Sequence, residues 1–109
     1  MLVNGLYLVT FKTPLGKGAG VAVLNDGQFH GGNSYHCFIG SYIVIGRHVS
    51  AEIAVSRHTE GEASVMGVDE MLVQVTGDVL PNGMSGRGFS QLAPGAPLYF
   101  ELDRIRAFS

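Results

Sequence analysis

The fold class is decided by residues 18–32, Gly18-Ala19-Gly20-Val21-Ala22-Val23-Leu24-Asn25-Asp26-Gly27-Gln28-Phe29-His30-Gly31-Gly32. Residues 18–24 are apolar and rich in valine, which is typical of a β-strand. Asp26 and Gly27 follow, and both tolerate the positive φ that a two-residue hairpin turn requires. Residues 28–32 then form the returning strand. The stretch predicts an antiparallel hairpin.

The same pattern recurs along the rest of the chain. Segments rich in β-branched and aromatic residues are separated by turn signals such as Pro81-Asn82-Gly83 and Ala93-Pro94-Gly95. Together they predict eight strands, at residues 5–11, 18–24, 28–32, 37–45, 49–57, 71–80, 86–91 and 98–105. Strands at this spacing with no helix between them indicate an antiparallel meander.

The number of strands favours closure. A barrel of about eight strands just holds its own side chains or one small ligand. Closure also removes exposed strand edges, which a chain with only 15% charged residues protects poorly. We therefore predict an all-β fold, an eight-stranded antiparallel up-and-down β-barrel, with residues 1–109 as a single domain. A two-sheet sandwich is the alternative, because strand pattern alone does not separate the two.

Composition narrows the function classes. The 109 residues include 16 glycines, 46% hydrophobic residues and a formal net charge of −2. High hydrophobicity with few charges excludes intrinsic disorder, and the lack of a basic excess argues against direct contact with nucleic acid. The longest apolar run, Tyr42–Ile45, is too short to cross a bilayer. With no secretory signal pattern at the N-terminus, we expect a cytoplasmic protein that does not contact a membrane.

Alternation along the strands predicts two kinds of surface. One face of each strand is expected to line the barrel interior, and the residues that we predict to line a cavity are Tyr7, Val9, Phe11, Val21, Val23, Ile53, Val55, Phe100 and Leu102. Two strands are apolar on their other face as well, which is unusual where that face meets water. We predict that these outward side chains, Leu6, Leu8, Ile43 and Ile45, form a dimer or partner surface.

Catalytic and metal-binding patterns are weak. The glycine-rich segments 16–20 and 83–88 lack the spacing of a phosphate loop, and we interpret the second as a flexible turn. Ser90 is not in a Gly-x-Ser-x-Gly elbow. The four histidines do not share the spacing of ligands on one strand, and Cys37 has no second cysteine to pair with. We expect no enzyme, no metal, no cofactor and no disulfide, with the histidines at the surface or at strand ends.

The first half of the chain resembles the GrlR-type negative regulators of type III secretion. The resemblance covers roughly residues 4–58 and rests on Asn4-Gly5-Leu6-Tyr7, Phe11, Gly18-Ala19-Gly20-Val21, Asn25-Asp26-Gly27, Gly31-Gly32-Asn33 and Phe38-Ile39-Gly40. It implies a lipocalin-like barrel that forms a homodimer and binds a transcriptional activator protein rather than DNA. Family members carry an acidic cluster, linked to partner binding, after the aromatic-x-Gly strand. Residues 41–48 contain no acidic residue.

Two functions follow as hypotheses. The first is a non-enzymatic regulatory protein, a negative regulator of type III secretion that acts by protein–protein binding to a transcriptional activator. The alternative is a lipocalin-like carrier or sensor of a small apolar ligand in the barrel cavity. The opening Gly5-Leu6-Tyr7 is similar to that of lipocalins, which carry tryptophan in place of the tyrosine. The two hypotheses are compatible, because a ligand can modulate the binding of a partner.

Overall fold

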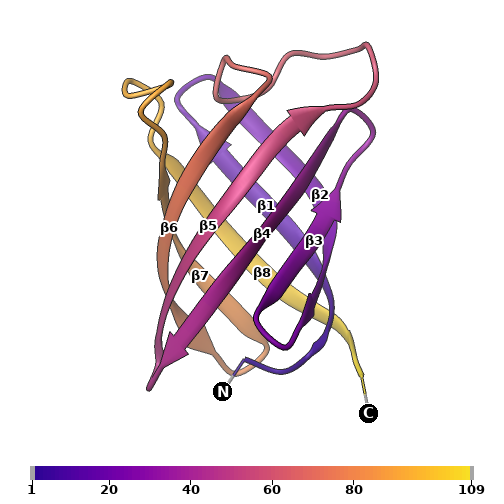
Figure 1. The fold of residues 1–109 in the computed structure, drawn as a ribbon, viewed down its shortest axis with the longest axis vertical. Helices are drawn as coiled ribbons and strands as arrows, with labels where there is room; N and C mark the ends of the chain where they lie inside the picture. The colour runs from indigo at the N-terminus through magenta and orange to yellow at the C-terminus, as the bar shows by residue number, and fades with distance from the viewer. Residues whose placement is uncertain (1, 109) are drawn as a thin grey trace.

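The computed structural model describes residues 2–108, which form eight antiparallel strands and no helix. The strands are β1 (Gly5–Thr13), β2 (Gly16–Asn25), β3 (Gln28–Gly32), β4 (His36–Ile45), β5 (His48–Arg57), β6 (Met71–Leu80), β7 (Gly83–Phe89) and β8 (Leu98–Ala107). Each strand pairs with the next, and β8 pairs with β1, so the sheet closes on itself (Figure 1). The predicted eight-stranded barrel is confirmed, and the sandwich alternative is excluded.

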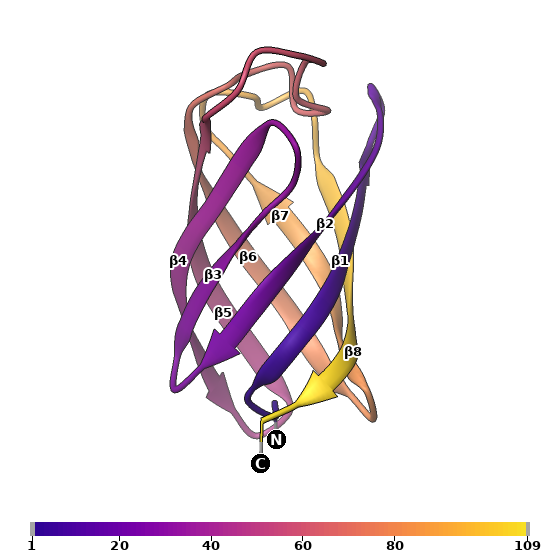
Figure 2. The same cartoon turned by 90° about the vertical axis from the view of Figure 1, so that its right-hand side faces the viewer.

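The two ends of the barrel are built differently. The lower end of Figure 1 holds both termini and the two-residue turns that join β2 to β3, β4 to β5 and β6 to β7. The upper end holds the β1–β2 turn and the longer connections 33–35, 58–70 and 90–97 (Figure 2). We use "lower end" and "upper end" in this sense throughout.

The hairpin that decides the fold class forms as predicted. Asp26 has a φ of 49° and Gly27 a φ of 84°, the pair of positive values that a tight hairpin turn requires. Antiparallel pairing then runs from Asn25–Gln28 at the turn to Val21–Gly32 at the far end of β3. The turn residues therefore fix the register of this hairpin locally.

The largest difference from the predicted strands lies in β7, which begins at Gly83 and ends at Phe89. Residues 83–88, interpreted above as a flexible turn, form most of this strand, so that interpretation is wrong. The reason is close approach: a Cβ atom at Gly83 would lie 1.7 Å from the Leu102 carbonyl oxygen, and one at Gly86 would lie 2.1 Å from that of Thr76. Glycine allows β7 to run tightly between its neighbours.

Candidate functional site

The interior of the barrel holds two packed groups of buried side chains, one toward each end. The lower group contains Leu2, Tyr7, Val9, Ala22, Leu24, Val49, Val79, Met84 and Leu102. The upper group contains Phe38, Ile53, Met66, Met71, Val73, Val75, Ala93 and Ala96. Phe11, Phe29 and Phe100 pack against both groups. Between these side chains lies a cavity of about 170 Å³, most of whose lining is aliphatic or aromatic.

The lower end of the cavity is closed by the N-terminal segment and by Tyr7. Leu2 is 7% exposed and lines the cavity, and Tyr7 is 1% exposed. The Tyr7 hydroxyl donates a hydrogen bond to the carbonyl oxygen of Val3, and the burial of this phenol raises its pKa above the ordinary value. The Tyr7 hydroxyl is therefore satisfied within the chain, in a largely apolar surrounding.

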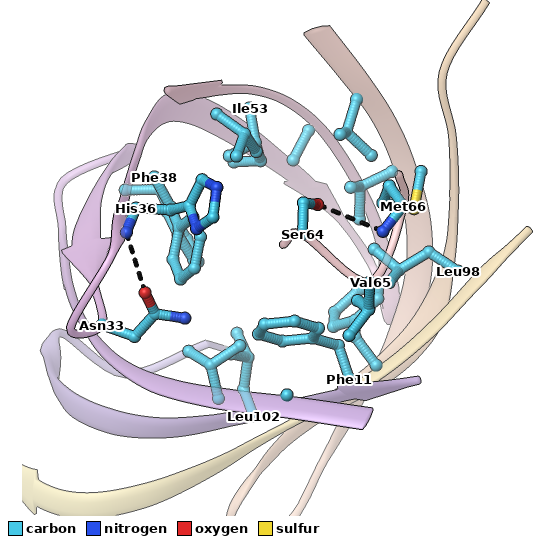
Figure 3. A pocket seen from close by; sticks show the side chains of 18 of the residues that line it. Phe11, Asn33, His36, Phe38, Ile53, Ser64, Val65, Met66, Leu98 and Leu102 are labelled. Carbon is cyan, nitrogen blue, oxygen red and sulfur yellow. Dashed lines mark hydrogen bonds between the residues drawn. The ribbon is translucent and has the colours of Figure 1, made fainter. Parts of the chain in front are cut away.

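The upper end is crossed by the loop of residues 58–70, which is tied down on both sides. On the β4 side, the His58 amide donates to the Tyr35 carbonyl at 2.9 Å. On the β1 side, the Thr13 hydroxyl donates to the Val65 carbonyl. Met66, which follows Val65, lines the cavity and is 4% exposed. The loop therefore covers part of the opening, with an apolar side chain directed into the barrel (Figure 3).

A charged cluster anchors the same loop to β4 and β5. Asp69 accepts hydrogen bonds from Arg57 Nη2 at 2.9 Å and from His36 Nε2 at 3.2 Å. The Arg57 hydrogen bond, followed by that of His36, lowers the pKa of the Asp69 carboxyl below its ordinary value. Because this carboxylate stays ionised at neutral pH, His36 Nε2 carries the proton in their hydrogen bond. Arg57 also donates to the Glu62 carbonyl at 2.8 Å.

Apart from Tyr42, which packs against the lower group, the polar side chains that line the cavity belong to the upper half of the barrel. Asn33 and Tyr35 come from the β3–β4 connection, His36 from the start of β4, and Ser64 from the 58–70 loop. Ser64 Oγ accepts a hydrogen bond from the Met66 amide at 3.1 Å. Figure 3 shows Asn33 and His36 at one edge of the cavity, with Phe11, Ile53 and Leu102 around it. The cavity thus has an apolar body and a polar upper rim.

Six of the nine predicted lining residues lie on this cavity: Val9, Phe11, Ile53, Val55, Phe100 and Leu102. Tyr7 also points inward but packs in the lower group, below the cavity. The prediction for Val21 and Val23 is wrong, because both lie on the outer face of β2, where Val21 is 46% exposed.

Strand register explains the inversion at β2. Directly paired residues of an antiparallel ladder share a face, and Val21 pairs with Leu8 while Val23 pairs with Leu6. The inward positions of β2 are small where they face a bulky residue of β1. A Cβ atom at Gly18, for example, would lie 2.4 Å from the Phe11 ring. The valines therefore face outward and Ala22 and Leu24 face inward.

The sequence interpretation missed several residues of the site. His36, Phe38, Tyr42 and Val44 all lie at even-numbered positions on the inward face of β4. Period-two alternation along this strand therefore carries a signal for His36 and Phe38. His36 is 5% exposed and therefore lies inside the barrel, although it does begin a strand as expected. Asn33, Ser64 and Met66 lie in connections, where no periodicity exists that can assign a direction to a side chain.

The four predicted surface residues are on the outside of the barrel but not together. Ile43 is 65%, Ile45 76% and Leu8 40% exposed, while Leu6 is half-buried. Ile43 and Ile45 lie on β4 past the residues that pair with β3. The last of these paired residues is Ser41. Leu6 instead begins a row of directly paired outward residues that crosses six strands: Leu6, Val23, His30, Ile39, Ala54 and Leu72. We call this set the outer apolar row.

The remaining candidate groups are dispersed. Within residues 2–108 no three His, Cys, Asp or Glu side chains come together as a metal site would require, and no helix there has the length and hydropathy of a membrane span. His48 lies 3.8 Å from Asp78 on the outside of the barrel, and Cys37 Sγ lies 3.1 Å from Ser56 Oγ. Comparison of the sequence with protein-family models and with curated proteins gives no match.

Proposed function

We propose that this protein binds a small apolar molecule inside the barrel, as a carrier or a sensor. The observation that carries the proposal is the cavity of about 170 Å³, lined mainly by aliphatic and aromatic side chains. Ligand sites in proteins are typically concave and largely apolar, with a few placed polar groups. The upper rim, with Asn33, Tyr35 and His36, supplies such groups.

The volume limits the size of the guest. A dry apolar cavity of about 150 Å³ in another protein accepts benzene. A cavity of about 170 Å³ therefore suits a molecule whose buried part is of the order of one aromatic ring or a short aliphatic chain. Larger drug-sized ligands need roughly 300 Å³ or more, so the proposal concerns a small molecule and not a long-chain lipid.

The test compares two alanine-to-leucine substitutions on β5. Ala51 lines the cavity, whereas Ala54 faces outward in the outer apolar row. Ala51→Leu fills part of the cavity, and we expect it to weaken binding of toluene at least tenfold, measured by NMR titration. Ala54→Leu changes the same strand by the same group and is expected to bind toluene like the unmodified protein. Equal binding by all three proteins, or none by the unmodified protein, would contradict the proposal.

A second function rests on a separate observation, the outer apolar row. Five of its six members are apolar, and His30 is the exception. Contiguous apolar surface of this kind marks contact sites more often than free surface. We propose that this row contacts a protein, either a second copy of the chain or the transcriptional activator that the GrlR resemblance implies. Because residues 41–48 lack the acidic cluster of that family, the proposed contact uses the apolar row instead.

Sedimentation equilibrium tests the contact with a second copy. Ile39, 46% exposed, lies in the middle of the row, and Thr76 is an exposed outward residue of β6 outside it. At micromolar concentration we expect a dimer that Ile39→Asp dissociates and Thr76→Asp leaves intact. If the unmodified protein is a monomer, the same two variants are compared for capture of an activator protein. Monomeric protein without such capture would defeat this second proposal.

A further inference from the structure

The side-chain amide of Asn33 has its orientation fixed by the backbone around it. Its Oδ1 atom accepts hydrogen bonds from the Tyr35 amide at 3.0 Å and from the His36 amide at 2.9 Å. Only the oxygen of a carboxamide can accept from backbone N–H groups, so the two ends of this amide are distinguishable without ambiguity. The NH₂ group must therefore lie on the opposite side from these two amides.

That NH₂ group faces the cavity. Asn33 is one of the lining residues, and Figure 3 shows its nitrogen directed toward the open interior, away from the His36 amide. Among the interactions of residues 2–108, the Asn33 Nδ2 atom donates no hydrogen bond. The residue is also held by its backbone: its amide donates to the His36 carbonyl at 2.9 Å, and its carbonyl lies 3.0 Å from His58 Nε2. The donor is thus preorganised.

The rest of the cavity sets the polarity of a guest. Its lower end is formed by apolar side chains such as Leu2, Leu24 and Leu102. Its two lining side chains that bear charge, Lys17 and Glu62, have opposite signs, so the cavity has no net preference for an ionic group. A ligand that covers the Asn33 NH₂ group without offering an acceptor would leave this group without a hydrogen-bond partner, which is unfavourable.

We propose that the ligand of this cavity is a small, neutral, apolar molecule that carries one hydrogen-bond acceptor, such as a ketone or aldehyde carbonyl. The carbonyl oxygen accepts from Asn33 Nδ2 at the upper rim, and the apolar part lies below it, beside Phe11 and Phe38, whose rings meet edge to face with centroids 5.9 Å apart. This inference rests on the proposed binding of an apolar ligand and adds its functional group and its orientation.

The experiment uses a pair of probes with the same shape. Acetophenone has a carbonyl oxygen where α-methylstyrene has a CH₂ group, so the two differ in the acceptor and hardly in size. We expect the full chain to bind acetophenone about fivefold or more tightly than α-methylstyrene after correction for their different hydration, because one more hydrogen bond is satisfied. Dissociation constants come from NMR titration.

Asn33→Asp is the decisive variant. An aspartate oxygen still accepts from the Tyr35 and His36 amides, so the β3–β4 connection keeps its structure, but the NH₂ donor is replaced by a carboxylate oxygen. We expect this variant to show no preference for acetophenone over α-methylstyrene in the ratio of their dissociation constants. Ser34→Asp adds the same charge at an exposed position that does not line the cavity, and we expect it to keep the preference.

Circular dichroism and the thermal midpoint confirm that each variant is folded. If Asn33→Asp binds both probes in the same ratio as the unmodified protein, the assignment of Asn33 as the acceptor-binding residue is wrong, although the cavity remains a ligand site. If neither probe binds the unmodified protein, the proposed function fails and this inference fails with it.

Discussion

The two ends of the barrel are closed by different kinds of structure. The lower end uses two-residue turns and a tightly packed group in which Tyr7 and Leu24 are each 1% exposed. The upper end uses the 13-residue connection 58–70, polar side chains and ion pairs. Binding residues in proteins are commonly carried by loops on a rigid scaffold. We infer that the lower end provides stability and that the upper end carries the polar groups of the proposed ligand site.

Truncating the same residue type at each end gives the largest expected difference. Leu24→Ala removes a side chain from the lower group and should reduce the free energy of unfolding by about 2–5 kcal/mol. Leu98 also lines the cavity but is only half-buried, so Leu98→Ala should reduce the free energy of unfolding by about 1 kcal/mol. Urea denaturation of both variants measures the difference. Equal losses would show that the upper end is packed as tightly as the lower.

The Tyr7 hydroxyl provides the next test, at the lower end. Tyr7→Phe removes the hydrogen bond to the Val3 carbonyl and should reduce the free energy of unfolding by about 1–2 kcal/mol near neutral pH. Tyr99→Phe, which removes an exposed hydroxyl from the outer face of β8, should have almost no effect.

The same residue predicts a dependence on alkaline pH. Burial raises the pKa of Tyr7 above its ordinary value of 10.0, so the folded protein keeps the phenolic proton that the unfolded chain releases. The corresponding stability is complete below pH 10.0 and is lost as the pH rises through the raised pKa. The free energy of unfolding, measured by urea denaturation from neutral to strongly alkaline pH, should therefore fall more steeply with pH in the unmodified protein than in Tyr7→Phe. The same pH dependence in both proteins would contradict this role for Tyr7.

The smallest expected effect lies at the upper end, in the Asp69 cluster. Asp69→Asn weakens the link from the 58–70 loop to Arg57 and His36. Because the Asp69 side chain is half exposed, the free energy of global unfolding should hardly change. Hydrogen exchange of the amides in residues 58–70 should become faster, while exchange in β1 and β2 should not. Asp103→Asn, at an exposed carboxylate on β8, is the charge-matched control.

Acid should reproduce this local effect. Arg57 and His36 lower the pKa of Asp69, so the contribution of the carboxylate is complete above its ordinary pKa of 3.8 and is lost as the pH falls through the lowered value. After correction for the intrinsic pH dependence of amide exchange, we expect the protection of the loop amides to fall below pH 3.8 in the unmodified protein and to stay unchanged in Asp69→Asn. A loop that exchanges equally fast in both proteins at neutral pH would mean that Asp69 does not hold it.

The sequence predicts the lining residues of a strand whose own alternation shows which face is buried. It does not predict them where pairing with another strand decides the face. On β5, alternate residues differ in polarity, and this pattern correctly predicts that Ile53 and Val55 face the interior. On β2, the two faces carry valines on one side and glycine, alanine and leucine on the other, so polarity does not distinguish them and the prediction for Val21 and Val23 is wrong. The pairing of β2 with β1 determines which face of β2 points into the barrel.

The sequence by itself determined the local features of this protein: the strands, the Asp26-Gly27 turn and the number of strands that favours a barrel. Their causes are backbone preferences and side-chain patterns that act over a few residues. Tertiary structure decided the rest, because closure of β8 on β1 brings distant segments together. His36 and Asp69 meet across the upper end although 33 positions separate them. The Asn33 amide is oriented by residues two and three positions away, but the cavity that it faces exists only because the strands close into a barrel.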